Sequence, residues 1–443
     1  MSGLSLWFHS RLRVFVAVLM VGLVASMHVQ AASTTPEDSE SANAAASEQE
    51  PELTLNNPGS VVDRLKEDAE REDYLFQFPG LSGFLKPWYD AKTDLTQTHG
   101  FRYGISYATF YQQASDHFGP EDDAAGFDLD ISASWEFLGR DTDSPTTLGF
   151  QFFRRDKNLG TEITPQVLFT QFGGLYSTAA PFGQTDSSIG EFWIQKKFRN
   201  VFGFRAGKIF PITAYDFFPF KNFRTDFVDF NHVTNATIPL PANGLGAFVV
   251  YRPRPNILLR LGAHDANADV EESGFDTYDG ELFTIFEVGF DTGLMPREPG
   301  RPPHGHIHFS LWHQDERDDA GIDDGWGFGV SRVQRFGRFS TFLRYGYADV
   351  NADGPTPSKH MANIGLAIDD IFGQNKDRIG IGYTWTEPAD GSLDNQGEID
   401  AYYRVQVTPQ IEVGPTFQVI FDPVRNPDED TVSVWGIRTR IAF

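Results

Sequence analysis

The 443-residue chain contains no cysteine, which excludes disulfides, thiolate metal sites and a cysteine nucleophile. After residue 31 it also lacks any long uninterrupted apolar run, so the sequence predicts no helical membrane span there. Positive charge is scarce, because 36 Lys and Arg stand against 61 Asp and Glu and leave a net charge of −25. Such a charge repels polyanions, and a nucleic-acid partner is therefore excluded.

Sequence patterns typical of common enzymes are missing as well. The chain has no G-x-S-x-G, H-E-x-x-H or G-x-x-x-x-G-K-[ST] segment. His304, His306 and His308 alternate in HGHIHF and would share one strand face, a spacing that is compatible with a metal site. No further ligand is identifiable, so we interpret them as histidines at the start of a strand. We predict no catalytic residues, no metal and no other cofactor.

The N-terminus has the pattern of an export signal. Arg11 and Arg13 precede the apolar run VFVAVLMVGLVASM, and VQA then offers small residues for cleavage. This order predicts a Sec signal peptide over residues 1–31, with an uncleaved anchor as the alternative. The run is shorter than the roughly 20 residues that a spanning helix needs, which favours cleavage and export.

Composition divides the rest of the chain into three parts. Residues 32–58 are rich in Ser, Ala and Glu and predict a disordered acidic tether. Residues 59–80 predict a short periplasmic helix and an entry segment, with Val61, Val62 and Leu65 on one narrow face. We interpret this helix as a solvated surface helix, and a partner-binding segment is the alternative. Residues 81–443 form one main domain.

Alternation in the last segment, TVSVWGIRTRIAF, shows what kind of domain this is. Trp435, Ile437, Thr439, Ile441 and Phe443 point one way, and Gly436, Arg438, Arg440 and Ala442 point the other way. Eight residue steps of about 3.3 Å, tilted by roughly 40°, cover about 20 Å, close to the apolar band of an outer-membrane barrel. The 41 Phe, 14 Tyr and 42 Gly also favour aromatic strands and turns over helical bundles.

The same pattern recurs along the chain and predicts an all-β transmembrane antiparallel barrel of about sixteen strands. Short turns alternate with long loops, as strands that cross a membrane in opposite directions require, with one exception at 292–303. The predicted strands are residues 100–115, 124–138, 145–155, 189–199, 201–210, 244–252, 256–265, 281–291, 304–314, 324–336, 338–349, 359–370, 377–386, 398–408, 410–421 and 431–443.

If apolar residues face lipid, the alternate residues line the channel. The predicted lining residues are Arg205, Arg260, Arg344, Tyr402, Arg404, Gln406, Arg438, Arg440, Glu191 and Glu412. Arginine forks and aromatic rings suit neutral polyhydroxylated solutes, although mutual neutralisation that keeps the pore wet is the alternative. The long aromatic segment 211–243 is the first candidate for a constriction, through Asp216, Phe217, Phe220, Lys221, Arg224, Asp226 and Asp229. A plug or a contact between protomers are the alternatives.

Three stretches resemble the OprB-type family of carbohydrate-selective porins. They are DAYYRVQVTPQIEVGPTFQVIFDP with TVSVWGIRTRIAF, then IGEFWIQKKFRNVFGFRAGKIF, and GAFVVYRPRPNILLRLGAHDANAD. The resemblance extends from about Leu81 to Phe443. It implies a sixteen-stranded barrel that admits monosaccharides by diffusion, with arginines and aromatic residues at its narrow zone.

We therefore predict a passive bacterial outer-membrane channel for small sugars and similar polar solutes. A porin for anions or carboxylates, a lipase-type barrel and a plugged structural barrel are the alternatives. Expected partners are small carbohydrate solutes, outer-membrane lipid and other copies of the chain, with a trimer as the common form. Asp clusters in the outward loops could bind cations that bridge to lipopolysaccharide, but solvation is the simpler interpretation.

Overall fold

In a computed structural model, residues 53, 55–69, 74–291, 305–373 and 377–443 are described. Residues 51–443 form one compact unit, to which the following description applies. The predicted signal peptide, most of the predicted tether, His304 and the long predicted turn at 292–303 lie outside the described residues.

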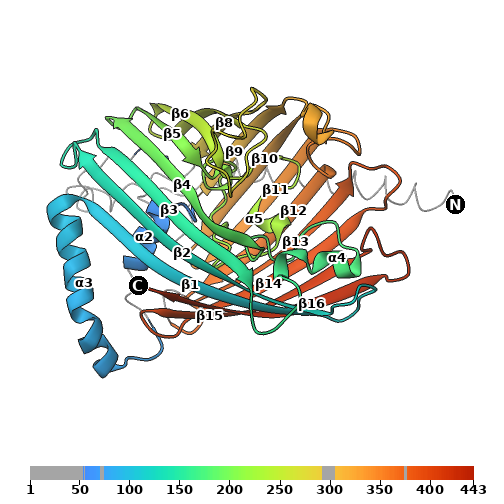
Figure 1. The fold of residues 1–443 in the computed structure, drawn as a ribbon, viewed down its shortest axis with the longest axis horizontal. Coiled ribbons are helices and arrows are strands. Elements are labelled where there is room, and N and C mark those ends of the chain that lie inside the picture. Colours follow the sequence, from blue (N-terminus) through green and yellow to red (C-terminus); the bar gives the residue numbers. More distant parts are fainter. Residues whose placement is uncertain (1–52, 54, 70–73, 292–304, 374–376) are drawn as a thin grey trace, which may run out of the picture. The chain divides into compact units, whose positions relative to one another are not determined.

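Sixteen antiparallel strands close into a barrel in which each strand pairs with its sequence neighbours and β1 pairs with β16 (Figure 1). The strands are β1 Phe101–Ala114, β2 Asp123–Leu138, β3 Thr146–Lys157, β4 Thr185–Phe198, β5 Phe202–Ile209, β6 Gly244–Arg254, β7 Ile257–Asp265, β8 Leu282–Asp291, β9 Gly305–Gln314, β10 Gly325–Phe336, β11 Phe339–Asp349, β12 Ser358–Asp369, β13 Arg378–Pro388, β14 Gln396–Gln406, β15 Ile411–Phe421 and β16 Thr431–Ala442. The predicted fold is confirmed. The largest shift is at β4, which starts at Thr185 because the polar stretch before Ile189 continues the pairing with β3.

Alternation along the strands sorts side chains between the two faces of the wall. In β16, Trp435 and Ile437 are 48% and 47% exposed, whereas Arg438 and Arg440 are each 3% exposed. At the closing seam, Arg438 lies opposite Phe110 of β1, so the inward face is continuous across the join. A one-residue slip would turn these arginines toward lipid, which fixes the register.

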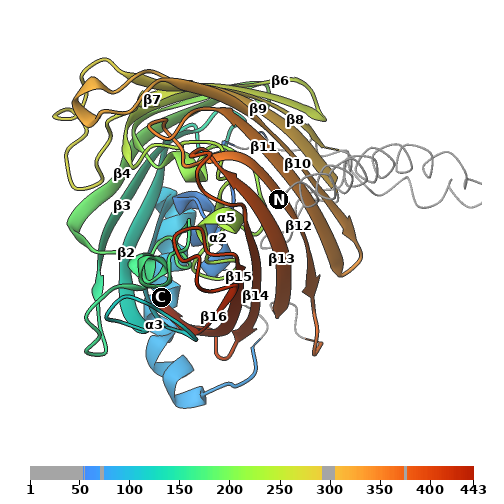
Figure 2. The same cartoon turned by 90° about the vertical axis from the view of Figure 1, so that its right-hand side faces the viewer.

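The helix α2 (Val61–Ala69) lies within the barrel, as Figure 2 shows. Its apolar face is buried, with Val61 0% and Leu65 6% exposed, and it contacts β1, β2 and β3. Arg64 pairs with Asp130 of β2 at 3.1 Å. The prediction of a solvated surface helix is therefore wrong, because an amphipathic pattern indicates one buried face without indicating what covers it.

The segment before α2 is also packed. Leu53 and Leu55 are fully buried, and the Asn57 side chain donates to the Tyr215 carbonyl at 2.9 Å. The expectation of a disordered tether over 32–58 is thus wrong for its last described residues, which are held by apolar contact and hydrogen bonds.

A second helix, α3 (Pro79–His99), lies at one end of the barrel and was missed by the sequence reasoning, which assigned residues 81–99 to the barrel. It packs against the outward faces of β1 and β2. Trp88 contacts Tyr103 edge-on at 5.3 Å, and the Trp135 indole donates to the His99 carbonyl at 3.1 Å. Gly100, with φ +67°, ends the helix in the left-handed conformation. No helix in the described part of the chain is long and apolar enough to cross a membrane.

Two loops fold back into the barrel rather than away from it (Figure 2). The inner loop, residues 210–243 between β5 and β6, contains η3 (Pro211–Thr213) and α5 (Phe230–Val233). The loop 158–184 contains η2 (Pro165–Val167) and α4 (Phe169–Phe172), and Leu168 and Phe172 pack on Ile420 and Val434 of the wall. A further short turn, η4 (Asp318–Ala320), lies between β9 and β10.

Candidate functional site

The inner loop crosses the lumen because its aromatic residues find apolar partners there. Phe218, Phe220 and Phe227 are fully buried and form one cluster with Phe342 of β11 and Tyr402 of β14. The Phe218 and Phe342 rings meet edge-on at 5.0 Å, and the Phe227 and Tyr402 rings at 4.8 Å. Burying this much aromatic surface is strongly favourable, so the loop has a well-defined place inside the barrel.

An arginine joins the inner loop to the acidic face of β2. Arg224 donates to Asp128 at 2.6 Å and to Asp130 at 3.1 Å, and all three side chains are almost fully buried. Arg155 of β3 also pairs with Asp128 at 2.8 Å, and Arg64 of α2 pairs with Asp130. Two buried carboxylates are thus neutralised by three guanidinium groups from three different elements.

An aspartate joins the same loop to the opposite wall. Asp216 accepts a hydrogen bond from Arg344 of β11, and its other oxygen lies 3.2 Å from Nε2 of His308 in β9. Burial alone would raise the pKa of Asp216, but Arg344 and Lys221 outweigh it and hold the pKa well below its usual range. Burial lowers the pKa of Lys221 to about 8 against the attraction of Asp216. The Lys221 ammonium donates to three loop carbonyls, including that of Tyr215 at 2.8 Å.

A second aspartate, Asp226, joins the inner loop to the wall through a single oxygen. One of its oxygens accepts from Arg378 of β13 at 2.9 Å, from the Tyr402 hydroxyl at 3.0 Å and from Arg404 at 3.4 Å. Beside it, Arg438 of β16 donates to the backbone carbonyls of Phe223 and Asp226 at 2.6 and 2.9 Å. The loop is therefore held by charge-assisted bonds to β13, β14 and β16.

All six arginines predicted to line the channel face inward and are 0 to 4% exposed; they are Arg205, Arg260, Arg344, Arg404, Arg438 and Arg440. Each is held by a polar partner. Arg260 pairs with Glu287 at 3.2 Å, and Arg440 pairs with Glu412 at 2.9 Å and with Asp68 of α2 at 2.7 Å. Arg205 donates to Gln195 and stacks on Trp193 at 3.9 Å. Whether any of them contacts a solute stays a prediction.

The remaining predicted residues lie at different places in the lumen. Glu191 of β4 accepts a hydrogen bond from the Trp193 indole at 2.8 Å. Several strands separate it from Glu412 of β15 around the barrel. Gln406 donates to the Thr408 carbonyl at the turn after β14. Phe217 packs on His306 at 4.6 Å between ring centres. The structure thus gathers the loop residues at the centre and spreads the wall residues around it.

Sequence reasoning missed several central residues. Asp128 and Asp130 of β2, which hold Arg224, were identifiable from the alternation in DLDIS, which turns both toward the lumen. Arg378 pairs with Asp226 at 2.9 Å and with Asp369 at 2.6 Å, and the alternation in RIGIGYTW likewise turns it toward the lumen. Arg64 was assigned to a surface helix, and its role depends on where α2 lies.

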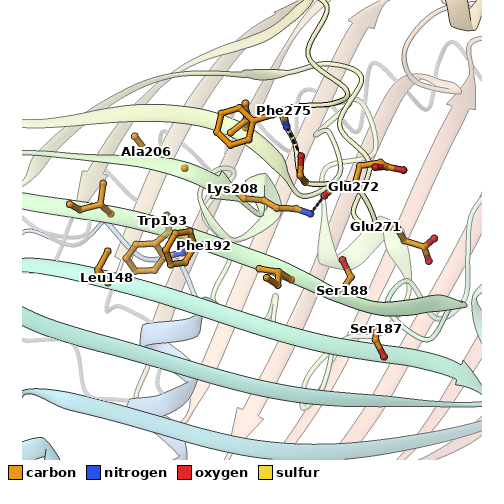
Figure 3. A pocket seen from close by; sticks show the side chains of 15 residues that line it. Leu148, Ser187, Ser188, Phe192, Trp193, Ala206, Lys208, Glu271, Glu272 and Phe275 are labelled. Carbon is orange, nitrogen blue, oxygen red and sulfur yellow. Dashed lines mark hydrogen bonds between the residues drawn. The ribbon is translucent and has the colours of Figure 1, made fainter.

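A separate hollow of about 660 Å³ lies on the outer wall (Figure 3). Outward side chains such as Leu148 and Phe192 line it, and Phe275 from the loop between β7 and β8 covers it. The Lys208 ammonium donates to the Val270 carbonyl at 2.9 Å and so holds this loop against the wall. Because Phe192 faces away from the lumen, we assign the hollow no part in the solute path.

Comparison with known proteins gives a family and a fold. The model of the carbohydrate-selective porin OprB family matches residues 323–443. OprB of Pseudomonas putida, in a high-pH structure, aligns with a TM-score of 0.63 and 15% identity over 80% of this chain and 97% of that chain. A triple mutant of the Rhodopseudomonas blastica porin aligns with a TM-score of 0.44 and 11% identity over 77% of this chain and 100% of that chain. No curated protein matches the chain in sequence.

These findings confirm the resemblance predicted from the sequence. The family match covers the closing strands that carried the prediction, and the first of the two structures shares the barrel fold. The family match over the closing strands and the shared barrel fold agree with the predicted passive porin.

Proposed function

We propose that this chain, a porin whose closing strands match the carbohydrate-selective family, admits small neutral sugars by diffusion past the inner loop. The inner loop supplies the narrow zone, because it spans from β2 to β14 and carries both charged and aromatic side chains. The hydroxyl groups of a neutral sugar can form hydrogen bonds with such a surface in place of those they formed with water. Such a solute passes more easily than an ion that must shed its hydration shell.

The observation that carries this proposal is the pairing of charge in the lumen. Arg260, Arg344, Arg404 and Arg440 each form an ion pair with an inward carboxylate. Paired charges cancel at a distance, so the lumen offers dipoles and hydrogen-bonding groups rather than a positive field that would concentrate anions. This favours neutral solutes over the anion-selective alternative.

A small cavity of about 20 Å³ beside the inner loop marks where we place the narrowest part of the path. It is lined by the Phe217 ring, the Arg260 guanidinium and the Glu287 carboxylate, among others. Its volume suffices for about one water molecule, so a sugar needs the loop to yield. An aromatic face beside charged hydrogen-bonding groups suits a sugar ring, which has an apolar side and a polar edge.

Two measurements on purified protein test the proposal. Proteoliposome swelling should show flux of monosaccharides, and reversal potentials in planar bilayers under a salt gradient should show weak ion selectivity. Strong anion preference without sugar flux would favour the anion porin. Absence of any conductance would favour a plugged structural barrel, and hydrolysis of phospholipid would favour an enzyme.

Location in the outer membrane follows from the porin family and the barrel fold. We further propose that Sec export with cleavage after residue 31 delivers the chain there, and that it contacts lipopolysaccharide and assembles as a homotrimer. The exposed apolar residues of the outer wall, such as Leu261, Phe309 and Leu311, support contact with lipid or with another copy.

A further inference from the structure

Among the described residues, no lysine or arginine pairs with a group of buried acids at the far end of the inner loop. Asp229 and His232 belong to the inner loop at α5, and Asp400 and Glu398 are successive inward residues of β14. All four side chains are 0 to 3% exposed. Within the described part of the chain, no lysine or arginine forms an ion pair with any of the three acids, in contrast to Asp226 on the same loop.

Asp400 is the most exceptional member of the group. It is fully buried, and neither of its carboxylate oxygens accepts a hydrogen bond of ordinary geometry from the described residues. Glu398 accepts one bond, from the Asn231 amide at 2.8 Å. Asp229 accepts from the His232 backbone N–H at 3.0 Å and faces its Nδ1 at 2.7 Å, and its carboxyl group also lies in hydrogen-bonding reach of Asp400. A buried carboxylate that lacks donors costs several kcal/mol unless a cation or a proton neutralises it.

Three of the four side chains have the donor atoms of a metal site. One ligand atom from each of Asp229, His232 and Asp400 lies within 4.8 Å of the others. An ion with bonds of about 2.1 Å needs its ligand atoms about 3.4 Å apart, a contraction that small side-chain rotations supply. Imidazole nitrogen combined with carboxylate oxygen suits zinc or manganese better than calcium, which takes oxygen ligands.

We propose that Asp229, His232 and Asp400 bind one divalent transition-metal ion, of the zinc or manganese class, which ties the inner loop to β14. Binding through Nδ1 releases the proton that His232 now shares with Asp229. The other ring nitrogen, Nε2, lies 3.5 Å from the Thr384 hydroxyl, which is placed to hold the ring in that tautomer. Glu398 adds negative charge beside the ion. The site does not depend on which solute crosses the pore.

The test uses the full-length porin, purified in detergent and treated with EDTA. Zinc chloride is titrated by calorimetry, and metal content after gel filtration is measured by mass spectrometry. We expect one zinc ion per chain in the wild type and binding at least tenfold weaker in Asp400→Asn, which keeps the shape of the side chain. Asp394→Asn, which changes an exposed loop acid, is the matched control and should bind as the wild type does.

Folding of each variant is checked by its migration on gels with and without heating. A second measurement needs no variant: cobalt bound to the wild type should give visible absorption bands that disappear when zinc is added. Absence of bound metal in the wild type, or equal binding by folded Asp400→Asn, overturns the proposal. Sugar swelling measured on the same samples tests the transport function separately, so the two can fail independently.

Discussion

Asp226→Asn is the substitution that most directly tests whether the inner loop sets the pore. One oxygen of Asp226 accepts three hydrogen bonds, from Arg378, Tyr402 and Arg404. Asparagine can place its carbonyl oxygen at the same position, so the packing survives while the negative charge is lost. The substitution thus changes the charge of the contact between the inner loop and the wall rather than its shape.

The size of the effect follows from the number of bonds. A charge-assisted hydrogen bond contributes about 1.5–3 kcal/mol, and a neutral one contributes about half as much. Weakening three bonds by roughly 1 kcal/mol each lowers the preference of the loop for its docked position by about 3 kcal/mol, or about 100-fold in the ratio of docked to undocked forms. Arg404 and Arg378 also lose part of their neutralising charge.

Single-channel recordings in planar bilayers measure both consequences. We expect larger and noisier conductance, and a reversal potential under a salt gradient that moves toward anion preference. Asp394→Asn, in an exposed loop, is the control for loss of one negative charge and should behave as the wild type does. Unchanged conductance and selectivity in folded Asp226→Asn would show that the loop does not control the pore.

Three further substitutions test the lipid face of the wall, a strained position within β5 and the helix in the lumen. Ile437→Arg puts a charge on the lipid face and should cost about 2–4 kcal/mol, measured as a lower urea midpoint for folding in liposomes; an unchanged midpoint would place Ile437 away from the bilayer centre. Gly207→Ala should destabilise the barrel by roughly 1–3 kcal/mol, because φ is +137° and a Cβ would lie 2.3 Å from the Phe192 carbonyl oxygen. The folded gel band should therefore be lost at a lower temperature, and equal thermal stability would contradict the strain. Asp68→Asn keeps only one of the two bonds from Arg440, because its amide NH2 cannot accept from the second guanidinium nitrogen. Conductance should rise if α2 restricts the pore, whereas identical conductance would show that it does not.

The barrel wall could be predicted because its signal is local. Alternation with period two decides the face of Arg438 or Ile437 from their immediate neighbours, and the closing strand needs no knowledge of the rest of the chain. The position of α2 could not be predicted in this way. Val61 and Leu65 indicate a buried face, but the surface that covers it is made by strands that follow much later in the sequence.

The central site follows the same division. The aromatic content of the segment 211–243 correctly indicated that it would not stand free in water. Its partners could not be predicted, because Asp226 meets Arg378 and Arg404 only after the barrel has closed, at separations of more than 150 residues along the chain. Alternation could place Asp128 and Asp130 of β2 on the lumen face. Their role as partners of Arg224 could be recognised only once the position of that arginine was known.

The arrangement of charge explains how one loop and one helix find their places in a wide barrel. The wall is polarised where the inserted elements touch it: β2 presents acids, and β11, β13, β14 and β16 present the arginines that pair with these elements. The inner loop and α2 both carry charges opposite to those of the wall they face. The inner loop directs Arg224 toward β2 and Asp216 and Asp226 toward the arginines. The helix α2 directs Arg64 toward β2 and Glu67 and Asp68 toward the arginines. Turning either element around would bring like charges together in a buried setting, at a cost of several kcal/mol. Apolar burial therefore holds the inner loop inside the barrel, whereas charge decides its orientation, and the lumen stays neutral enough for uncharged solutes because each anchor cancels a charge of the wall.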